Sequence, residues 1–130
     1  MIFLALFCLI VLPIGMYRWG KRHYPEKLWF ITGVSFGLIA SPFSMGLYGF
    51  YFMSSLGFIP GMLGFVLTVL HAGPGLEILG LVGLREDGNV VSNMQRVKME
   101  VINGVVWGIL YGIAGSVVDN YLASRKQSKL

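Results

Sequence analysis

Two ionisable side chains, His71 and Glu77, stand inside a long apolar stretch and are the residues best suited to chemistry. Between Leu28 and Leu84, Glu77 is the only acid or base apart from that histidine. An ionised acid at the centre of a bilayer costs about 2.5–3.5 kcal/mol on insertion scales, so such residues are usually paired, hydrated or functional. The sequence between the two is Gly73-Pro74-Gly75, which combines the two residue types that most often interrupt a helix.

A break in the helix would decide whether these two side chains can meet. On a continuous helix, residues six positions apart point in directions that differ by about 240°. A break at Gly73-Pro74-Gly75 could bring His71 and Glu77 together, and it would expose backbone groups able to bind an ion. These five residues are therefore the predicted ligand-binding or ion-binding site. In the alternative interpretation, Glu77 lies in water near an interface and His71 hydrogen-bonds a neighbouring carbonyl.

No other complete motif for metal binding or phosphate binding is found in the sequence. There is no His-x-x-x-His, the single cysteine is Cys8, and no complete Gly-x-x-x-x-Gly-Lys-Ser/Thr phosphate loop occurs. Two carboxylates close enough to each other for general acid–base catalysis are not evident. We therefore expect no catalytic residue, no metal site and no enzymatic activity, and the sequence identifies no cofactor.

The spacing of the charges predicts the elements that must hold the candidate site. The chain has 130 residues, of which 55% are hydrophobic and only 12% are charged, and its mean hydropathy is +0.72. A crossing of the bilayer needs roughly 20 apolar residues. The uncharged stretches 1–17 and 101–118 each suit one crossing, and residues 28–84 suit two. The prediction is an all-α integral membrane protein with one domain, 1–130, and about four transmembrane helices, near 1–19, 28–52, 61–84 and 93–121, of which the third is broken at Gly73-Pro74-Gly75.

Small residues recur at every fourth position in two of these helices. Gly is 18 of the 130 residues, and spacing by four places side chains on one face of a helix. Where lipid supplies no hydrophobic driving force, such faces let helix backbones approach closely. We therefore predict a glycine-rich bundle, either packed within one chain or associated with a second copy or a partner. The predicted packing residues are Gly33, Gly37, Ser41, Gly104, Gly108 and Gly112.

Two local signals complete the prediction of topology. Ser92 and Gln95 form a capping-box pattern, so the last helix is expected to begin at Asn93. Basic residues favour the cytoplasmic side of a membrane, and with four crossings an outside N-terminus leaves 4 + 3 = 7 of them inside and 3 outside. Connections 18–27 and 85–99 are then cytoplasmic, but the basic tail is left outside, whereas three or five crossings would place it with the first connection. The three basic groups are Arg18, Lys21, Arg22 and Lys27; Arg85, Arg96 and Lys98; and Arg125, Lys126 and Lys129.

These features favour a non-catalytic subunit or scaffold of a larger membrane assembly. Its expected partners are the lipid bilayer and a membrane protein or a second copy bound through the glycine faces, and nucleic acid is not expected because no basic patch is interleaved with aromatic residues. One alternative is a small homo-oligomeric transporter or channel with a midplane site at the broken third helix. The other alternative is a membrane anchor of a redox complex, in which a haem would need His71 and a histidine of a partner chain.

Overall fold

The computed structural model describes residues 2–51, 58–71, 73, 75–85 and 92–128, and the side chains of 7–44, 59, 61–71, 73, 75–85 and 92–128. Every element in this part of the chain is helical. The elements are α1 (Ile2–His23), the 3-10 turn η1 (Pro25–Lys27), α2 (Leu28–Tyr51), α3 (Phe58–His71), α4 (Gly75–Leu81) and α5 (Asn93–Gln127). Among the described residues, α5 is long and apolar enough to cross a membrane, and α3 with α4 would add a second span if the pair is one broken crossing.

The helix boundaries follow from local sequence signals. Ser92 has extended backbone angles, and its hydroxyl accepts a hydrogen bond of 3.1 Å from the backbone N–H of Gln95, so α5 begins at Asn93 as predicted. The sequence predicts one helix over 61–84 with a break at Gly73-Pro74-Gly75. The structure has two helices in this region: α3 ends at His71 and α4 begins at Gly75. Their axes differ by 43°.

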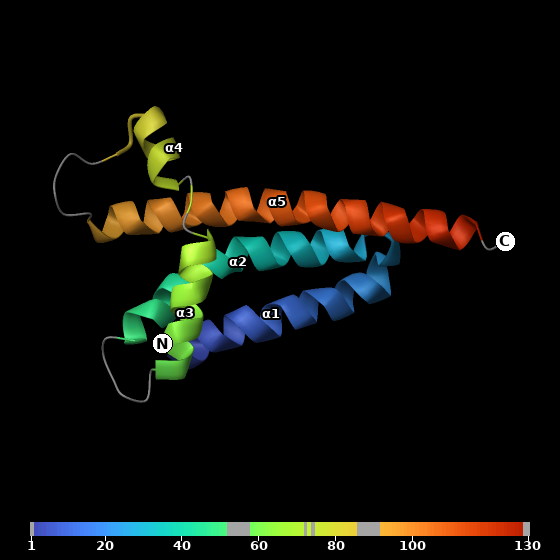
Figure 1. Cartoon of the computed structure of the whole chain (residues 1–130), viewed down its shortest axis with the longest axis horizontal. Coiled ribbons are helices and arrows are strands. Elements are labelled where there is room, and N and C mark those ends of the chain that lie inside the picture. Colours follow the sequence, from blue (N-terminus) through green and yellow to red (C-terminus); the bar gives the residue numbers. More distant parts are fainter. Residues whose placement is uncertain (1, 52–57, 72, 74, 86–91, 129–130) are drawn as a thin grey trace.

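Three long helices, α1, α2 and α5, lie alongside one another; near one end α3 crosses them, and α4 stands on the side of α5 away from α2 (Figure 1). Helix α2 is central and contacts α1, α3 and α5, while α4 packs against α5. Helix α3 runs steeply across α2 near the N-terminus of the chain (Figure 1). The opposite end holds the turn between α1 and α2 and the last turns of α5. We call it the basic end and define it as residues 18–28 and 119–128.

The glycines of α2 and α5 face each other. A Cβ atom added at Gly33 or Gly37 would lie less than 3.0 Å from backbone atoms of α5, and one added at Gly104 or Gly115 would lie that close to the backbone of α2. Only residues without a side chain permit this approach. Rising numbers on α2 meet falling numbers on α5, so the helices are antiparallel; the contacts are Trp29 with Gly115, Gly33 with Tyr111, Gly37 with Gly108 and Leu38 with Gly104.

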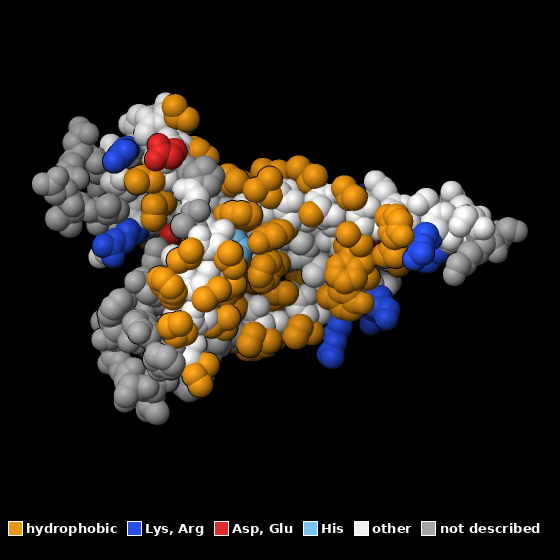
Figure 2. Space-filling view, viewed as in Figure 1, with side chains coloured by type: hydrophobic (Ala, Val, Ile, Leu, Met, Phe, Trp, Pro, Cys, Tyr) orange, Lys and Arg blue, Asp and Glu red, His pale blue; other side chains and the backbone are white. Residues whose placement is uncertain are grey.

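Burial in the described residues is the reverse of that in a water-soluble domain, where large apolar side chains fill the interior. The buried hydrophobic side chains are Cys8, Leu9, Ala40 and Leu79. The buried polar or charged side chains are Ser41, Ser44, His71, Gln95, Glu100 and Asn103. Large hydrophobic side chains are exposed instead along α1, α2, α3 and α5, and Figure 2 shows them over the middle of the molecule, with Lys and Arg toward its ends.

One carboxylate joins α5 to the start of α2 at the basic end. The two side-chain oxygens of Asp119 accept hydrogen bonds from the backbone N–H groups of Trp29, at 3.0 Å, and Phe30, at 2.9 Å. These N–H groups belong to the first turn of α2 and have no partner within that helix. A negative charge is also favoured at a helix N-terminus. Asp119 therefore caps α2 from a residue about 90 positions away in sequence.

Candidate functional site

A row of polar and aromatic side chains on α5 runs beside its glycines. Glu100, Asn103, Trp107 and Tyr111 are spaced by three, four and four residues, which places them on one face of the helix. This face meets α2, the end of α3 and the start of α4, where the partners are Ser41, His71 and Gly75. We call these seven residues the polar cluster.

The imidazole of His71 is the centre of the polar cluster and is only 2% exposed. Its Nδ1 lies 2.7 Å from the carbonyl oxygen of Leu67. A carbonyl can only accept, so Nδ1 carries the hydrogen, and in the neutral ring Nε2 is then the acceptor. The hydroxyl of Tyr111, 3.0 Å from Nε2, donates to it. Both ring nitrogens are therefore engaged within the chain.

Two side chains of α5 satisfy the backbone at the break between α3 and α4. The indole Nε1 of Trp107 donates to the carbonyl oxygen of His71 at 3.1 Å. The backbone N–H of Gly75 donates to Oδ1 of Asn103 at 2.8 Å. A Cβ at Gly75 would lie 2.7 Å from that oxygen, so a larger residue would not fit there. At the break, hydrogen bonds to α5 thus replace hydrogen bonds within a helix, so these two backbone groups stay paired.

A buried acid occupies the other end of the polar cluster. Glu100 is 9% exposed, and its Oε2 accepts a hydrogen bond from the hydroxyl of Ser41 on α2. The hydroxyl of Ser44 donates to the carbonyl of Ser41 at 2.8 Å, and the hydroxyl of Thr68 on α3 reaches Ser44 at 3.4 Å. Within the described part of the chain, no buried side-chain nitrogen or oxygen lacks a hydrogen-bond partner.

The structure does not bring together the two residues that the sequence analysis paired. Glu77 lies on the exposed side of α4, whereas His71 is buried against Tyr111 and Trp107. Gly73 is exposed, and Pro74 is outside the described residues. Of the alternative interpretation, the structure shows the hydrogen bond of His71 to a carbonyl and the exposure of Glu77. The predicted packing residues Gly33, Gly37, Ser41, Gly104, Gly108 and Gly112 all lie at the contact of α2 with α5.

The sequence analysis missed Glu100, Asn103, Trp107 and Tyr111. Their spacing by three and four residues was the available signal. It is hidden because the same turns of α5 carry the glycines, and because Glu100 immediately precedes the uncharged stretch 101–118 and so resembles a flanking charge.

Two short motifs in the sequence resemble catalytic or phosphate-binding patterns, and both lie inside continuous helices. Residues 33–37 read Gly-Val-Ser-Phe-Gly, but the nucleophile elbow with this pattern requires a strand-to-helix turn, and here Ser35 donates to the carbonyl of Ile31 at 2.7 Å. Residues 15–21 read Gly-Met-Tyr-Arg-Trp-Gly-Lys within α1, where no phosphate-cradling loop can form. Neither motif has the backbone that its chemistry needs.

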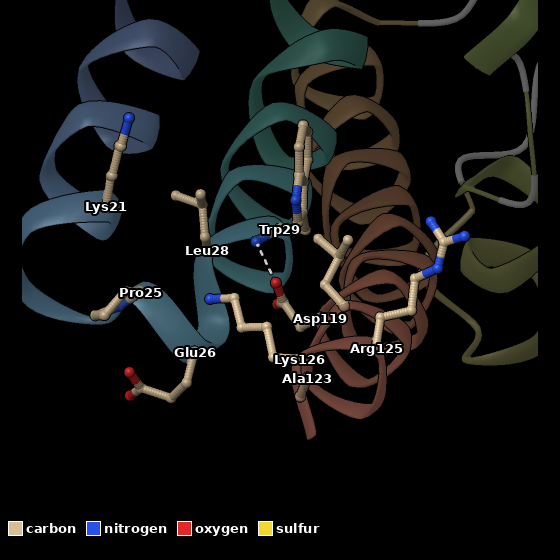
Figure 3. Close-up of a pocket in the computed structure, with 10 residues that line it drawn as sticks. Lys21, Pro25, Glu26, Leu28, Trp29, Asp119, Ala123, Arg125 and Lys126 are labelled. Carbon is tan, nitrogen blue, oxygen red and sulfur yellow. Dashed lines mark hydrogen bonds between the residues drawn. The ribbon is translucent and has the colours of Figure 1, made fainter. Parts of the chain in front are cut away.

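A groove with a volume of about 730 Å³ lies away from the polar cluster, at the basic end. Figure 3 shows it between the turn after α1, the start of α2 and the last turns of α5. Lys21, Arg125 and Lys126 line it together with Trp29 and the Asp119 cap. Over the described residues, no group of three or more His, Cys, Asp or Glu side chains is placed to hold a metal ion.

Comparison of the chain with protein-family models, with curated proteins and with solved structures finds no match. The geometry of the molecule is therefore the basis for any functional conclusion.

Proposed function

We propose that the protein is a non-catalytic subunit or scaffold of a membrane assembly, and that the polar cluster stabilises its fold instead of binding a ligand. The observation that supports this most directly is the closure of the cluster. The carbonyl of His71 and the N–H of Gly75, which an ion could have used, bond Trp107 and Asn103. Both nitrogens of the His71 ring and the Glu100 carboxylate are bonded within the chain as well.

The distribution of apolar surface supports the membrane part of the proposal. Ile59, Leu70 and Leu81 are 79%, 61% and 87% exposed. Leaving such side chains in water instead of burying them costs about 1.5–3 kcal/mol each, whereas lipid removes that cost. In lipid, helices must instead associate through small residues and hydrogen bonds. Helices α2 and α5 associate in this way, through glycine contacts and buried polar groups.

Three crossings, formed by α1, α2 and α5, suit this arrangement better than four. At about 1.5 Å per residue, these helices are roughly 33, 36 and 52 Å long, enough for a core of about 30 Å. Helix α3 runs across them and not beside them (Figure 1). With three crossings the tail joins the first connection, so one side of the membrane carries 4 + 3 = 7 basic residues and the other carries 3. The positive-inside rule then makes the basic end cytoplasmic and moves connection 85–99 outside.

Cysteine labelling tests this topology. In a Cys8→Ala background, single cysteines are introduced at Glu26, Asn93 and Ser128, all of which are exposed. An impermeant maleimide applied to intact cells should label position 93 and should reach 26 and 128 only after permeabilisation. If 26 and 128 react from opposite sides, the three-crossing proposal is wrong.

The subunit proposal is tested on the purified chain. Extracted in mild detergent from its own membrane, it should have a particle mass that includes a different protein. Reconstituted alone into liposomes, it should conduct no ions across roughly pH 5–8, the range in which histidine side chains change charge. A chain that is found alone or only with copies of itself, and that conducts ions in liposomes, contradicts the proposal.

One observation favours transport as a second candidate function. The polar cluster places an imidazole, a phenol and a carboxyl group where α2, α3 and α5 meet, and buried ionisable groups in membranes often mark ion pathways. If wild-type liposomes show flux, Tyr111→Phe and Glu100→Gln should each abolish it. The redox-anchor alternative needs His71 as a haem ligand and is not favoured, because Nε2 of His71 already bonds the hydroxyl of Tyr111.

A further inference from the structure

The groove at the basic end is lined by cations, by apolar side chains and by the indole of Trp29. Lys21 comes from α1, while Arg125 and Lys126 come from α5, and all three are exposed (Figure 3). The sequence separates these residues by about a hundred positions, and only the antiparallel return of α5 brings them to one groove.

The acidic residues of the groove do not cancel these charges. Its lining contains two carboxylates, Glu26 and Asp119. Asp119 uses both oxygens to accept the N–H groups of Trp29 and Phe30, and Figure 3 shows the bond to Trp29 as a dashed line. Glu26 is exposed on the turn. The lining thus contains three cations and one carboxylate that is not engaged in capping, so its net charge suits an anion.

The aromatic residues place this anion at the depth of lipid headgroups. The ring centres of Tyr17 and Trp29 lie 5.9 Å apart, and the guanidinium carbon of Arg125 lies 5.4 Å from the ring centre of Tyr121. Tyr and Trp concentrate at the boundary between headgroups and hydrocarbon. The lining also contains the apolar side chains of Leu28, Leu122 and Ala123.

We propose that this groove binds the headgroup phosphate of an anionic phospholipid, with Lys21, Arg125 and Lys126 as its cations. The inference rests on the proposed membrane location, in which the basic end is cytoplasmic and faces the leaflet that is richer in anionic lipid. A volume of about 730 Å³ accommodates a phosphoglycerol headgroup with the upper part of its chains. The site would fix the depth of the basic end in the membrane.

The test compares lipids that differ in charge. Delipidated protein in a neutral detergent is titrated with phosphatidylglycerol or phosphatidylcholine, and bound lipids are counted by native mass spectrometry. Wild type should prefer phosphatidylglycerol. The variant Lys21→Gln, Arg125→Gln, Lys126→Gln should lose up to about fivefold in affinity for each charge removed, and Lys126→Gln alone should lose up to about fivefold.

The matched control removes the same number of charges at the other end of the molecule, as Arg85→Gln, Arg96→Gln, Lys98→Gln. It should keep the wild-type preference. Equal losses in both triple variants, or no loss in either, would overturn the proposal. Displacement of phosphatidylglycerol by millimolar inorganic phosphate would also overturn it, by showing a site for a soluble anion.

The outcome of the lipid-binding experiment is independent of the subunit proposal. A wild-type chain that conducts ions alone would refute the subunit proposal and leave the lipid preference intact. Loss of the lipid preference would leave the composition of the assembly unchanged.

Discussion

Replacing Gly37 by alanine is the sharpest test of the contact between α2 and α5. The new Cβ would lie less than 3.0 Å from backbone atoms of Trp107 and Gly108, whereas ordinary contacts are 3.4–4 Å. Backbone atoms cannot rotate away as a side chain can, so the helices must separate by roughly 1 Å. A gap of that size forfeits a quarter to a half of each dispersion contact along the interface.

We expect Gly37→Ala to lower the free energy of unfolding by about 3 kcal/mol, the upper part of the range for overpacked cores. For a chain of this size, 1 kcal/mol corresponds to about 3–5 °C in Tm, so Tm should fall by roughly 9–15 °C. The assay uses the single, buried Cys8, because a thiol-reactive dye reports its exposure as the protein unfolds in detergent.

Gly15→Ala is the matched control on α1, where a Cβ would meet nothing within 4 Å. Alanine has the higher helix propensity, so this variant should be unchanged or more stable by up to about 1 kcal/mol. If Gly37→Ala has the same Tm as wild type while Gly15→Ala behaves as expected, the backbones of α2 and α5 are not in contact and the reasoning is refuted.

Three further substitutions test individual hydrogen bonds, the first two by the same dye assay and the third by amide hydrogen exchange. Tyr111→Phe should cost about 1–3 kcal/mol, because Nε2 of buried His71 loses its donor; an unchanged Tm would remove Tyr111 from the cluster. Asp119→Asn keeps one acceptor oxygen but loses the charge at the start of α2, and should cost about 1 kcal/mol; a rise in Tm would contradict the capping role. Asn103→Ala leaves the N–H of Gly75 without its acceptor, so amide hydrogen exchange in α4 should accelerate while that in α1 stays the same.

Local features of this fold could be predicted from sequence, because neighbouring residues determine them. The start of α5 follows from the Ser92 hydroxyl and the Gln95 N–H three residues later. The end of α3 and the start of α4 follow from the Gly-Pro-Gly sequence, since proline cannot donate and glycine weakens a helix. The helical class follows from composition alone.

The arrangement of the helices and the partners of His71 could not be predicted in the same way. Hydropathy gives the length of an apolar segment but not its direction in the fold. It therefore does not distinguish α3, which runs across the bundle, from the long helices that α3 crosses. The Tyr111 hydroxyl reaches His71 across 40 positions of sequence, and no local pattern reports that distance. Glu77 is only six positions from His71, yet the change of axis after α3 carries it to the exposed side of α4.

The even spacing of the glycines has a consequence for how α2 and α5 find their alignment. A surface that repeats every four residues looks similar after a slip of one helical turn, about 5.4 Å, and packed helices are known to shift by such steps. The glycine contacts therefore hold the helices together without fixing the register between them. Two polar contacts can fix it, since Asp119 meets the start of α2 at one end and Glu100 meets Ser41 toward the other. A slip of one turn would break both and leave the buried Glu100 and Ser41 unpaired, so a few hydrogen bonds select one register among several of similar packing energy.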